Sequence, residues 1–218
     1  MRRVHVLLAA GAIVLNLNSG AFAQAASNPN LNAQLLVAAR QGDLRALDQA
    51  LERGAAPNSR NRLGKTALLI ACEKGQAAMA EHMLVAGADV NFASLEGVTP
   101  LMAAAYGGHA AIAKRLLDAG ARPQPVDRMK KPAVVYAAGQ GHAEVLALLL
   151  DKGVPVDAAY EHDLTALMWA AGQGQADAVK LLLARGARTD LRDDRGFTAA
   201  EIARQAGHEQ IAQVLVAR

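Results

Sequence analysis

The sequence predicts an all-α solenoid built from about six helix-turn-helix repeats of 33 residues. Glycine recurs every 33 residues without an insertion, at Gly42, Gly75, Gly108, Gly141, Gly174 and Gly207. A second series keeps the same spacing, at Gly54, Gly87, Gly120, Gly153 and Gly186. Self-similarity at a fixed period of this length is typical of stacked repeats. The chain is 52% hydrophobic but only 3% aromatic, which favours closely spaced helices over a β-sandwich or barrel.

Each repeat is predicted to contain two short helices separated by a glycine turn. In the third repeat, Thr99 can cap the first helix through its hydroxyl, and Pro100 suits the first helical position. Gly108 permits the left-handed turn that ends this helix, and a second helix follows over about 110–119. Such short helices are marginal alone, so we expect each repeat to be stabilised by burying its apolar face on its neighbours.

Small residues precede the turn glycines and would let the first helices approach one another closely. The pairs are Ala38-Ala39, Ala71-Cys72, Ala104-Ala105, Ala137-Ala138 and Ala170-Ala171. The end repeats depart from the pattern, as caps do where stacking stops. Ala33 fills the capping position of the first repeat, and Ala200 and Arg204 replace apolar or small residues in the last.

These residues resemble the ankyrin repeat, whose pattern reads G-x-T-P-L, A-A, G-H, L-L-L and G-A. The third repeat shows the pattern most completely, with Gly97-Val98-Thr99-Pro100-Leu101, Ala104-Ala105, Gly108-His109, Leu116-Leu117 and Gly120-Ala121. The resemblance covers about residues 32–218. It implies a hairpin finger before two antiparallel helices in each repeat, stacked into a curved solenoid. It also implies a binding function, because ankyrin proteins generally bind partner proteins with the concave groove and the finger tips.

The N-terminal residues are predicted to form a cleavable secretory leader. Arg2 and Arg3 are basic, residues 4–17 form an apolar run, and Ala21-Phe22-Ala23 has the small-x-small pattern of a signal-peptidase site. The run is shorter than the about 20 residues that a transmembrane anchor needs. Cleavage is expected after Ala23, or else after Ala25. The expected division is therefore a leader at 1–23, a short polar lead-in at 24–31 and the repeat domain at 32–218, in a periplasmic or secreted protein.

Charge and cysteine content narrow the possible partners. Loss of the leader removes Arg2 and Arg3 from the 23 basic residues, which leaves 21 against 20 acidic residues. A nearly neutral chain has no general electrostatic reason to bind nucleic acid or an anionic membrane. The only cysteine, Cys72, permits no internal disulfide, and we expect it to be a small buried hydrophobe.

No catalytic, cofactor or metal site is predicted. His109, His142 and His208 recur in phase, but stacked helices lie about 8–10 Å apart, too far for histidines to share an ion held by bonds of about 2 Å. We expect these histidines to bind backbone groups at the turns. Residues 139–141 lack the strand and the lysine of a phosphate loop, and residues 160–163 fall at a solvated finger tip.

The candidate partner-binding residues are those that the first helices and the fingers direct towards the concave groove. Counted from the threonine position, positions four, seven and eight of a first helix share one face, away from the core-facing positions. Aromatic residues on such a surface are typical interface hot spots. The candidates are Tyr106, Tyr136, Tyr160, Trp169, Phe197, Arg128, Met129, Lys131, Glu161, His162, Gln140 and Gln173.

Two interpretations remain open for part of this set. Tyr136 and Trp169 fit packing between neighbouring first helices as well as they fit contact with a partner. Tyr106 and Tyr160 favour the partner, because their positions are expected to face away from the core between repeats.

The fourth and fifth repeats break the pattern near these candidates. Lys130 and Asp163 replace the glycine of the finger turn, and Pro132 replaces the capping threonine. A non-glycine residue held in a left-handed conformation costs about 1–2 kcal/mol. Departures of this kind mark either a functional site or ordinary drift between repeats.

The function predicted from these features is that of an exported monomer that binds another, unidentified protein and catalyses nothing. A narrower alternative is a dedicated inhibitor, immunity or protective accessory protein of one exported enzyme. An enzyme in its own right would need a constellation of reactive residues that the sequence does not contain.

Overall fold

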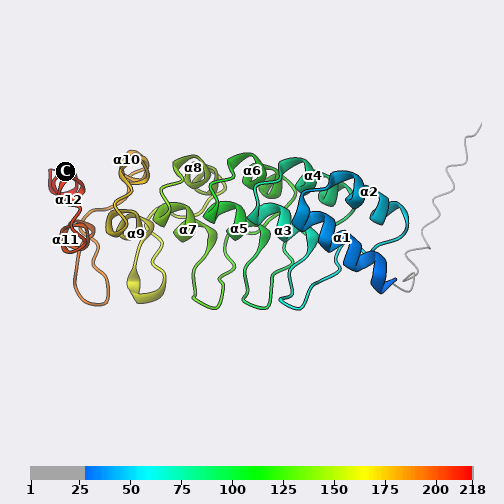
Figure 1. The fold of residues 1–218 in the computed structure, drawn as a ribbon. Helices are drawn as coiled ribbons and strands as arrows, with labels where there is room; N and C mark the ends of the chain where they lie inside the picture. The colour runs from blue at the N-terminus through cyan, green and yellow to red at the C-terminus, as the bar shows by residue number, and fades with distance from the viewer. Residues whose placement is uncertain (1–27, 218) are drawn as a thin grey trace, which may run out of the picture.

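The structure, a computed structural model, describes residues 28–217, so the predicted leader and the first half of the polar lead-in lie outside the described residues. Within this range the chain is all-α and forms six consecutive helix pairs (Figure 1). An isolated antiparallel bridge between Ala159 and Thr165 is the one β-type pairing of the described part. The helices are α1 Pro29–Gln41, α2 Leu44–Glu52, α3 Ala67–Glu73, α4 Ala77–Val85, α5 Pro100–Tyr106, α6 Ala110–Asp118, α7 Ala133–Gly139, α8 Ala143–Asp151, α9 Ala166–Gly172, α10 Ala176–Ala184, α11 Ala199–Gln205 and α12 Glu209–Val216.

The helix pairs stack side by side in two layers. Figure 1 shows the odd-numbered helices in one layer and the even-numbered helices in the other, with the loops between pairs extending beyond the odd-numbered layer. Each odd-numbered helix contacts the equivalent helix of the next pair, so α5 lies between α3 and α7. The prediction of a solenoid of stacked helix pairs is therefore confirmed.

The core between neighbouring first helices is built from the small-residue pairs. Ala104 and Ala105 are fully buried, as are Ala71 and Cys72 one repeat earlier. Close helix approach excludes water from the Cys72 thiol, and this desolvation raises its pKa far above the usual range. A thiol that stays protonated is inert, so the prediction that Cys72 is a buried hydrophobe is confirmed.

The turn between the two helices of a pair is filled by a side chain from the next pair. A Cβ atom at Gly75 would come within 2.5 Å of the His109 ring, and one at Gly108 would come as close to the His142 ring. The His142 Nε2 atom also lies 3.0 Å from the Tyr106 carbonyl oxygen. His109 and His142 therefore each pack against the turn of the preceding repeat. For His142, the predicted contact with a backbone group is confirmed.

The first helix begins earlier than the repeat pattern predicts. The sequence pattern places the capping position at Ala33, and the start of the repeat domain at residue 32. In the structure, Asn28 caps α1 by accepting a hydrogen bond from the Asn30 amide, and Pro29 occupies the first helical turn. This local capping signal adds a turn of helix before the position that the other repeats use.

Candidate partner-binding groove

Five loops, here called fingers 2 to 6, connect the helix pairs on one side of the solenoid. Each is closed by a hydrogen bond from the amide of its first residue to the carbonyl of its fifth, 2.9 Å long in finger 3 and 3.3 Å long in finger 4. In fingers 2, 4 and 6 the first residue is Asn or Asp, and its side chain accepts two further amide bonds within the finger. The fingers are residues 61–65, 94–98, 127–131, 160–164 and 193–197.

Finger 4 shows how this local hydrogen bonding works. The buried Asp127 carboxylate accepts from the Met129 amide at 2.9 Å and from the Lys131 amide at 3.0 Å. The Tyr136 hydroxyl donates to the other carboxylate oxygen. A short polar side chain at the first position thus satisfies the turn amides and joins the finger to helix α7.

Neighbouring fingers are joined by one backbone hydrogen bond at three of the four junctions. The amide of Leu95 donates to the Leu63 carbonyl at 3.0 Å, that of Arg128 to the Glu96 carbonyl at 2.9 Å, and that of Asp194 to the His162 carbonyl at 3.1 Å. The equivalent bond between fingers 5 and 4 would join the Glu161 amide to the Met129 carbonyl, and it is not formed. The row of fingers is therefore interrupted between fingers 4 and 5.

Tyr160 explains the interruption. It stands at the first position of finger 5, where the other fingers have Asn, Ser or Asp, so no short polar side chain is present to bind the turn amides. The finger instead forms a 3-10 turn over Glu161–Asp163, with φ of 62° at His162 and 55° at Asp163. Lys130 of finger 4 is also left-handed, with φ of 54°. The sequence pattern marked Lys130 and Asp163 as replacements of the turn glycine without deciding their conformation, and it gave no indication for His162.

Ten of the twelve candidate residues line two hollows on the finger side of the solenoid. The first, of about 260 Å³, lies between fingers 4 and 5, and the second, of about 350 Å³, lies on the face of helices α5, α7 and α9. We call the two together the finger-side groove. The first hollow is lined by Met129, Lys131, Tyr160, Glu161, His162 and Trp169, and the second by Tyr106, Tyr136, Gln140 and Gln173 together with Met129, Lys131 and Trp169.

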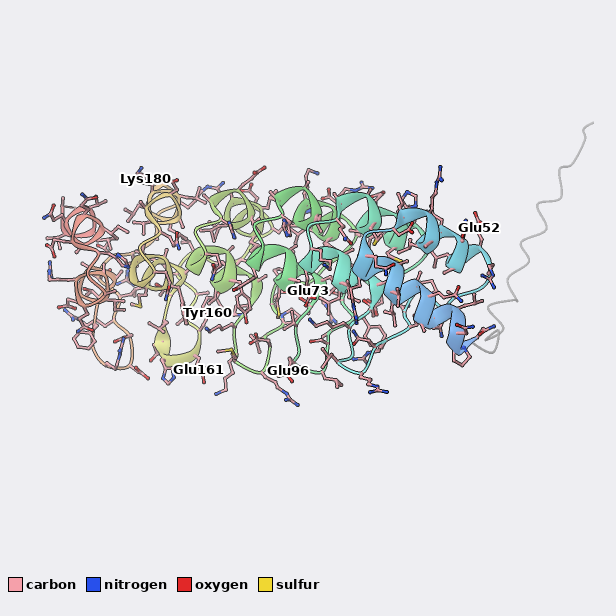
Figure 2. All side chains as sticks on the ribbon, viewed as in Figure 1. Glu52, Glu73, Glu96, Tyr160, Glu161 and Lys180 are labelled. Atoms are coloured by element: carbon pink, nitrogen blue, oxygen red, sulfur yellow. The ribbon has the colours of Figure 1, made fainter. Side chains whose placement is uncertain are left out.

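The twelve candidates leave out several contributors to this groove. Val135 lines both hollows from helix α7, Lys130 and Leu164 line the first, and Gly139 lines the second. Asp127 holds finger 4 in shape from beneath. The recurrence of Asn, Ser or Asp at the first finger position was the available signal for Asp127. In Figure 2, Tyr160 lies between helix α9 and the finger tip that carries Glu161, whereas Lys180 lies on the opposite surface.

The remaining two candidates lie apart from these hollows. Arg128 is exposed at the tip of finger 4, where its guanidinium lies 3.1 Å from the Glu96 carboxylate. Phe197 is half-buried in finger 6, with the Arg195 guanidinium 5.3 Å from its ring centroid. Both side chains therefore already contact a neighbour on their own surface.

The four aromatic candidates of the groove differ in burial. Tyr106 is 57% exposed and packs edge-on against Tyr136, with ring centroids 5.7 Å apart. Tyr136 is half-buried, and desolvation together with its bond to Asp127 raises its phenol pKa well above the usual range. Tyr136 therefore supports the groove structurally while its ring forms part of the lining.

The expectation that Tyr160 faces away from the core is wrong. Tyr160 is half-buried and packs against the apolar core, and desolvation raises its pKa to about 12. The reason is its position, because the first residue of a finger points into the finger base, as the burial of Ser94, Asp127 and Asp193 shows. Trp169 is also half-buried, so both packing and groove-lining apply to it.

The described residues offer no metal centre or membrane span. Across 28–217, no three His, Cys, Asp or Glu side chains are grouped so that they could hold a metal ion. Nor does any helix of that range have the length and apolar character needed to cross a bilayer. What the groove presents is an apolar and aromatic surface with amide and charged groups at its edges.

A solenoid of stacked helix pairs, with a row of fingers and two hollows on one side, is the architecture of a repeat protein. The family model for ankyrin repeats matches the chain three times, over residues 35–127, 77–160 and 134–218. The chain therefore belongs to the ankyrin-repeat family. Members of this family are generally protein-interaction modules and typically non-catalytic scaffolds. No protein of curated function matches the chain.

Proposed function

We propose that this protein is an exported, non-catalytic module that binds another protein through the finger-side groove. The observation that carries the proposal is the presence of exposed apolar side chains in this groove and on the fingers beside it. Leu63, Leu95, Tyr106 and Met129, on fingers 2 to 4 and helix α5, are between 57% and 61% exposed. A group of exposed apolar residues edged by charges is typical of a protein-interaction surface. Together with the hollows beside Met129, these side chains offer a surface that a monomer can present to its partner.

Site-specific photo-crosslinking tests the location of this interface. A benzophenone amino acid at Tyr106 should form crosslinks to one partner protein in the exported fraction. The same group at Lys180, which is exposed on the outer helix α10, should not. Equal crosslinking from the two positions would contradict the assignment of the interface to the groove.

Export rests on the leader pattern at 1–23, with Arg2 and Arg3 before an apolar run and Ala21-Phe22-Ala23 at its end. We expect the mature protein to begin near Gln24 and to be found outside the cytoplasm without a membrane anchor. N-terminal sequencing of the protein from fractionated cells measures this directly. Recovery of an intact chain beginning at Met1 in the membrane fraction would contradict it.

A further inference from the structure

Lys131 holds a positive charge against the aromatic floor of the groove. Its ammonium lies 4.4 Å from the centroid of the Trp169 ring, and its side chain lines both hollows. A cation over an aromatic face is attracted by the ring quadrupole but still benefits from an anionic partner. The position of Lys131 therefore places a charge where a bound partner would cover it.

The equivalent lysine two repeats earlier has such an anionic partner. Lys65 occupies the last position of finger 2, and its ammonium lies 2.7 Å from the Glu73 carboxylate on helix α3. The position that corresponds to Glu73 in the fourth repeat is Gly139, so helix α7 offers no carboxylate to Lys131. Among residues 28–217, no carboxylate lies within the 4.0 Å of an ion pair with Lys131.

The other acidic and basic side chains of the groove already have partners. Lys130 lies 3.0 Å from the Glu161 carboxylate, which joins fingers 4 and 5 by their side chains. His162 Nδ1 lies 2.7 Å from the Asp194 carboxylate of finger 6. The second hollow is lined by no charged residue besides Lys131. Lys131 is therefore the unmatched charge of this part of the groove.

The interruption of the finger row lies at the same place. The Glu161 amide and the Met129 carbonyl make no backbone hydrogen bond with each other, whereas the equivalent groups are bonded at the other three junctions. The hollow between these fingers has an apolar floor that includes Tyr160 and Trp169. Backbone groups that are not joined to each other, beside an apolar hollow, suit an extended chain, which offers amides, carbonyls and side chains together.

We propose that the opening between fingers 4 and 5 docks an extended acidic segment of the partner protein. A large apolar side chain of that segment sits on Tyr160 and Trp169, and a neighbouring Asp or Glu carboxylate pairs with Lys131. The proposal rests on the proposed binding function and adds the chemistry of the partner. A basic segment would place like charges together, and a neutral one would cover the Lys131 ammonium without a counter-charge, so both bind more weakly.

A selection of peptides tests this chemistry, because Trp169 is the only tryptophan of the chain and reports occupancy of the site through its fluorescence. Displayed random octapeptides are selected on the purified protein, and enriched peptides are synthesised and titrated. We expect enrichment of Asp or Glu beside Leu, Ile or Phe, with a change in Trp169 emission on binding. Replacing the acidic residue of a peptide by its amide should weaken binding by about tenfold, the scale of a charged hydrogen bond.

Three variants distinguish an effect of the Lys131 charge on peptide binding from an effect on folding. Lys131→Met keeps a side chain of similar length over Trp169 and should remove the preference for the acidic peptide over its amide. Lys131→Arg should retain the preference. Lys180→Met, on the opposite surface, should leave it unchanged, and thermal melting checks that every variant is folded.

Three results would each overturn the inference: selected peptides without an acidic preference, a preference that survives in Lys131→Met, or no peptide that alters Trp169 emission. Any of these alongside specific crosslinking from Tyr106 would leave the binding function standing and remove only the acidic segment. Loss of specific crosslinking would remove the binding function itself.

Discussion

The first residue of each finger decides whether the turn can close around a short polar side chain. Asp127 does this in finger 4, where one carboxylate binds two amides and a tyrosine hydroxyl. Tyr160 cannot do it in finger 5, and the finger takes a different turn with two left-handed residues. A single side chain therefore changes both the local hydrogen bonding and the contact with the neighbouring finger.

Replacement of Asp127 tests this account of the finger. Asp127→Ala leaves the Met129 and Lys131 amides and the Tyr136 hydroxyl without their acceptor, so we expect a loss of about 1–3 kcal/mol in the free energy of unfolding. Asp127→Asn keeps one carbonyl oxygen for the two amides and should lose less. Urea denaturation measures both variants, and an alanine variant as stable as the parent would contradict the role of Asp127.

At the scale of the elements, much of the helical architecture follows from the period of 33 residues. The turn glycines, the small pairs and the capping threonines each satisfy a local rule, and the same rule holds wherever the residue recurs. The sequence therefore predicted the paired helices. It also predicted the ten groove-lining residues, which were chosen by their positions within the 33-residue repeat.

The features that escaped prediction depend on contacts outside the period. The early start of α1 follows from Asn28 and Pro29, which precede the repeat pattern. The burial of Tyr160 and the left-handed conformation of His162 follow from the way finger 5 packs against the solenoid. The 33-residue repeat pattern does not predict these contacts. The one indication in the sequence was Tyr160 itself, which stands where the other fingers have a short polar residue.

Two variants at the fourth residue of a finger test how much backbone strain a non-glycine residue causes there. Gly97 has φ of 78°, and a Cβ there would lie 3.1 Å from the Asp127 Cα atom of the next finger. Gly97→Ala should therefore destabilise the protein by about 1–3 kcal/mol. The reverse change one finger later, Lys130→Gly, relieves a left-handed lysine and loses only a surface ion pair, so its stability should change by less than about 1 kcal/mol. Similar losses in the two variants would show that the finger turn is not the source of strain.

At the scale of the whole molecule, the departures from repetition gather around one part of the groove. The left-handed Lys130, the interrupted finger row and the only tryptophan all lie in the fourth and fifth repeats. The outer helices present ordinary charged surfaces, with ion pairs between successive helices such as Arg185 with Asp151. An interaction module would place its distinctive residues where the partner binds and keep the regular pattern elsewhere.

The affinity for the crosslinked partner measures whether the finger-side groove is the binding surface. Tyr106 and Met129 are each more than half exposed, so the double variant Tyr106→Ala with Met129→Ala should alter the free energy of unfolding by no more than about 0.5 kcal/mol per site. Each true hot spot that it removes should weaken binding by about 2 kcal/mol, roughly thirtyfold in Kd. Lys180→Ala serves as the control on the outer surface. We expect a large loss of affinity in the folded double variant and none in the control. Equal affinities in the two variants would show that the groove is not the binding surface.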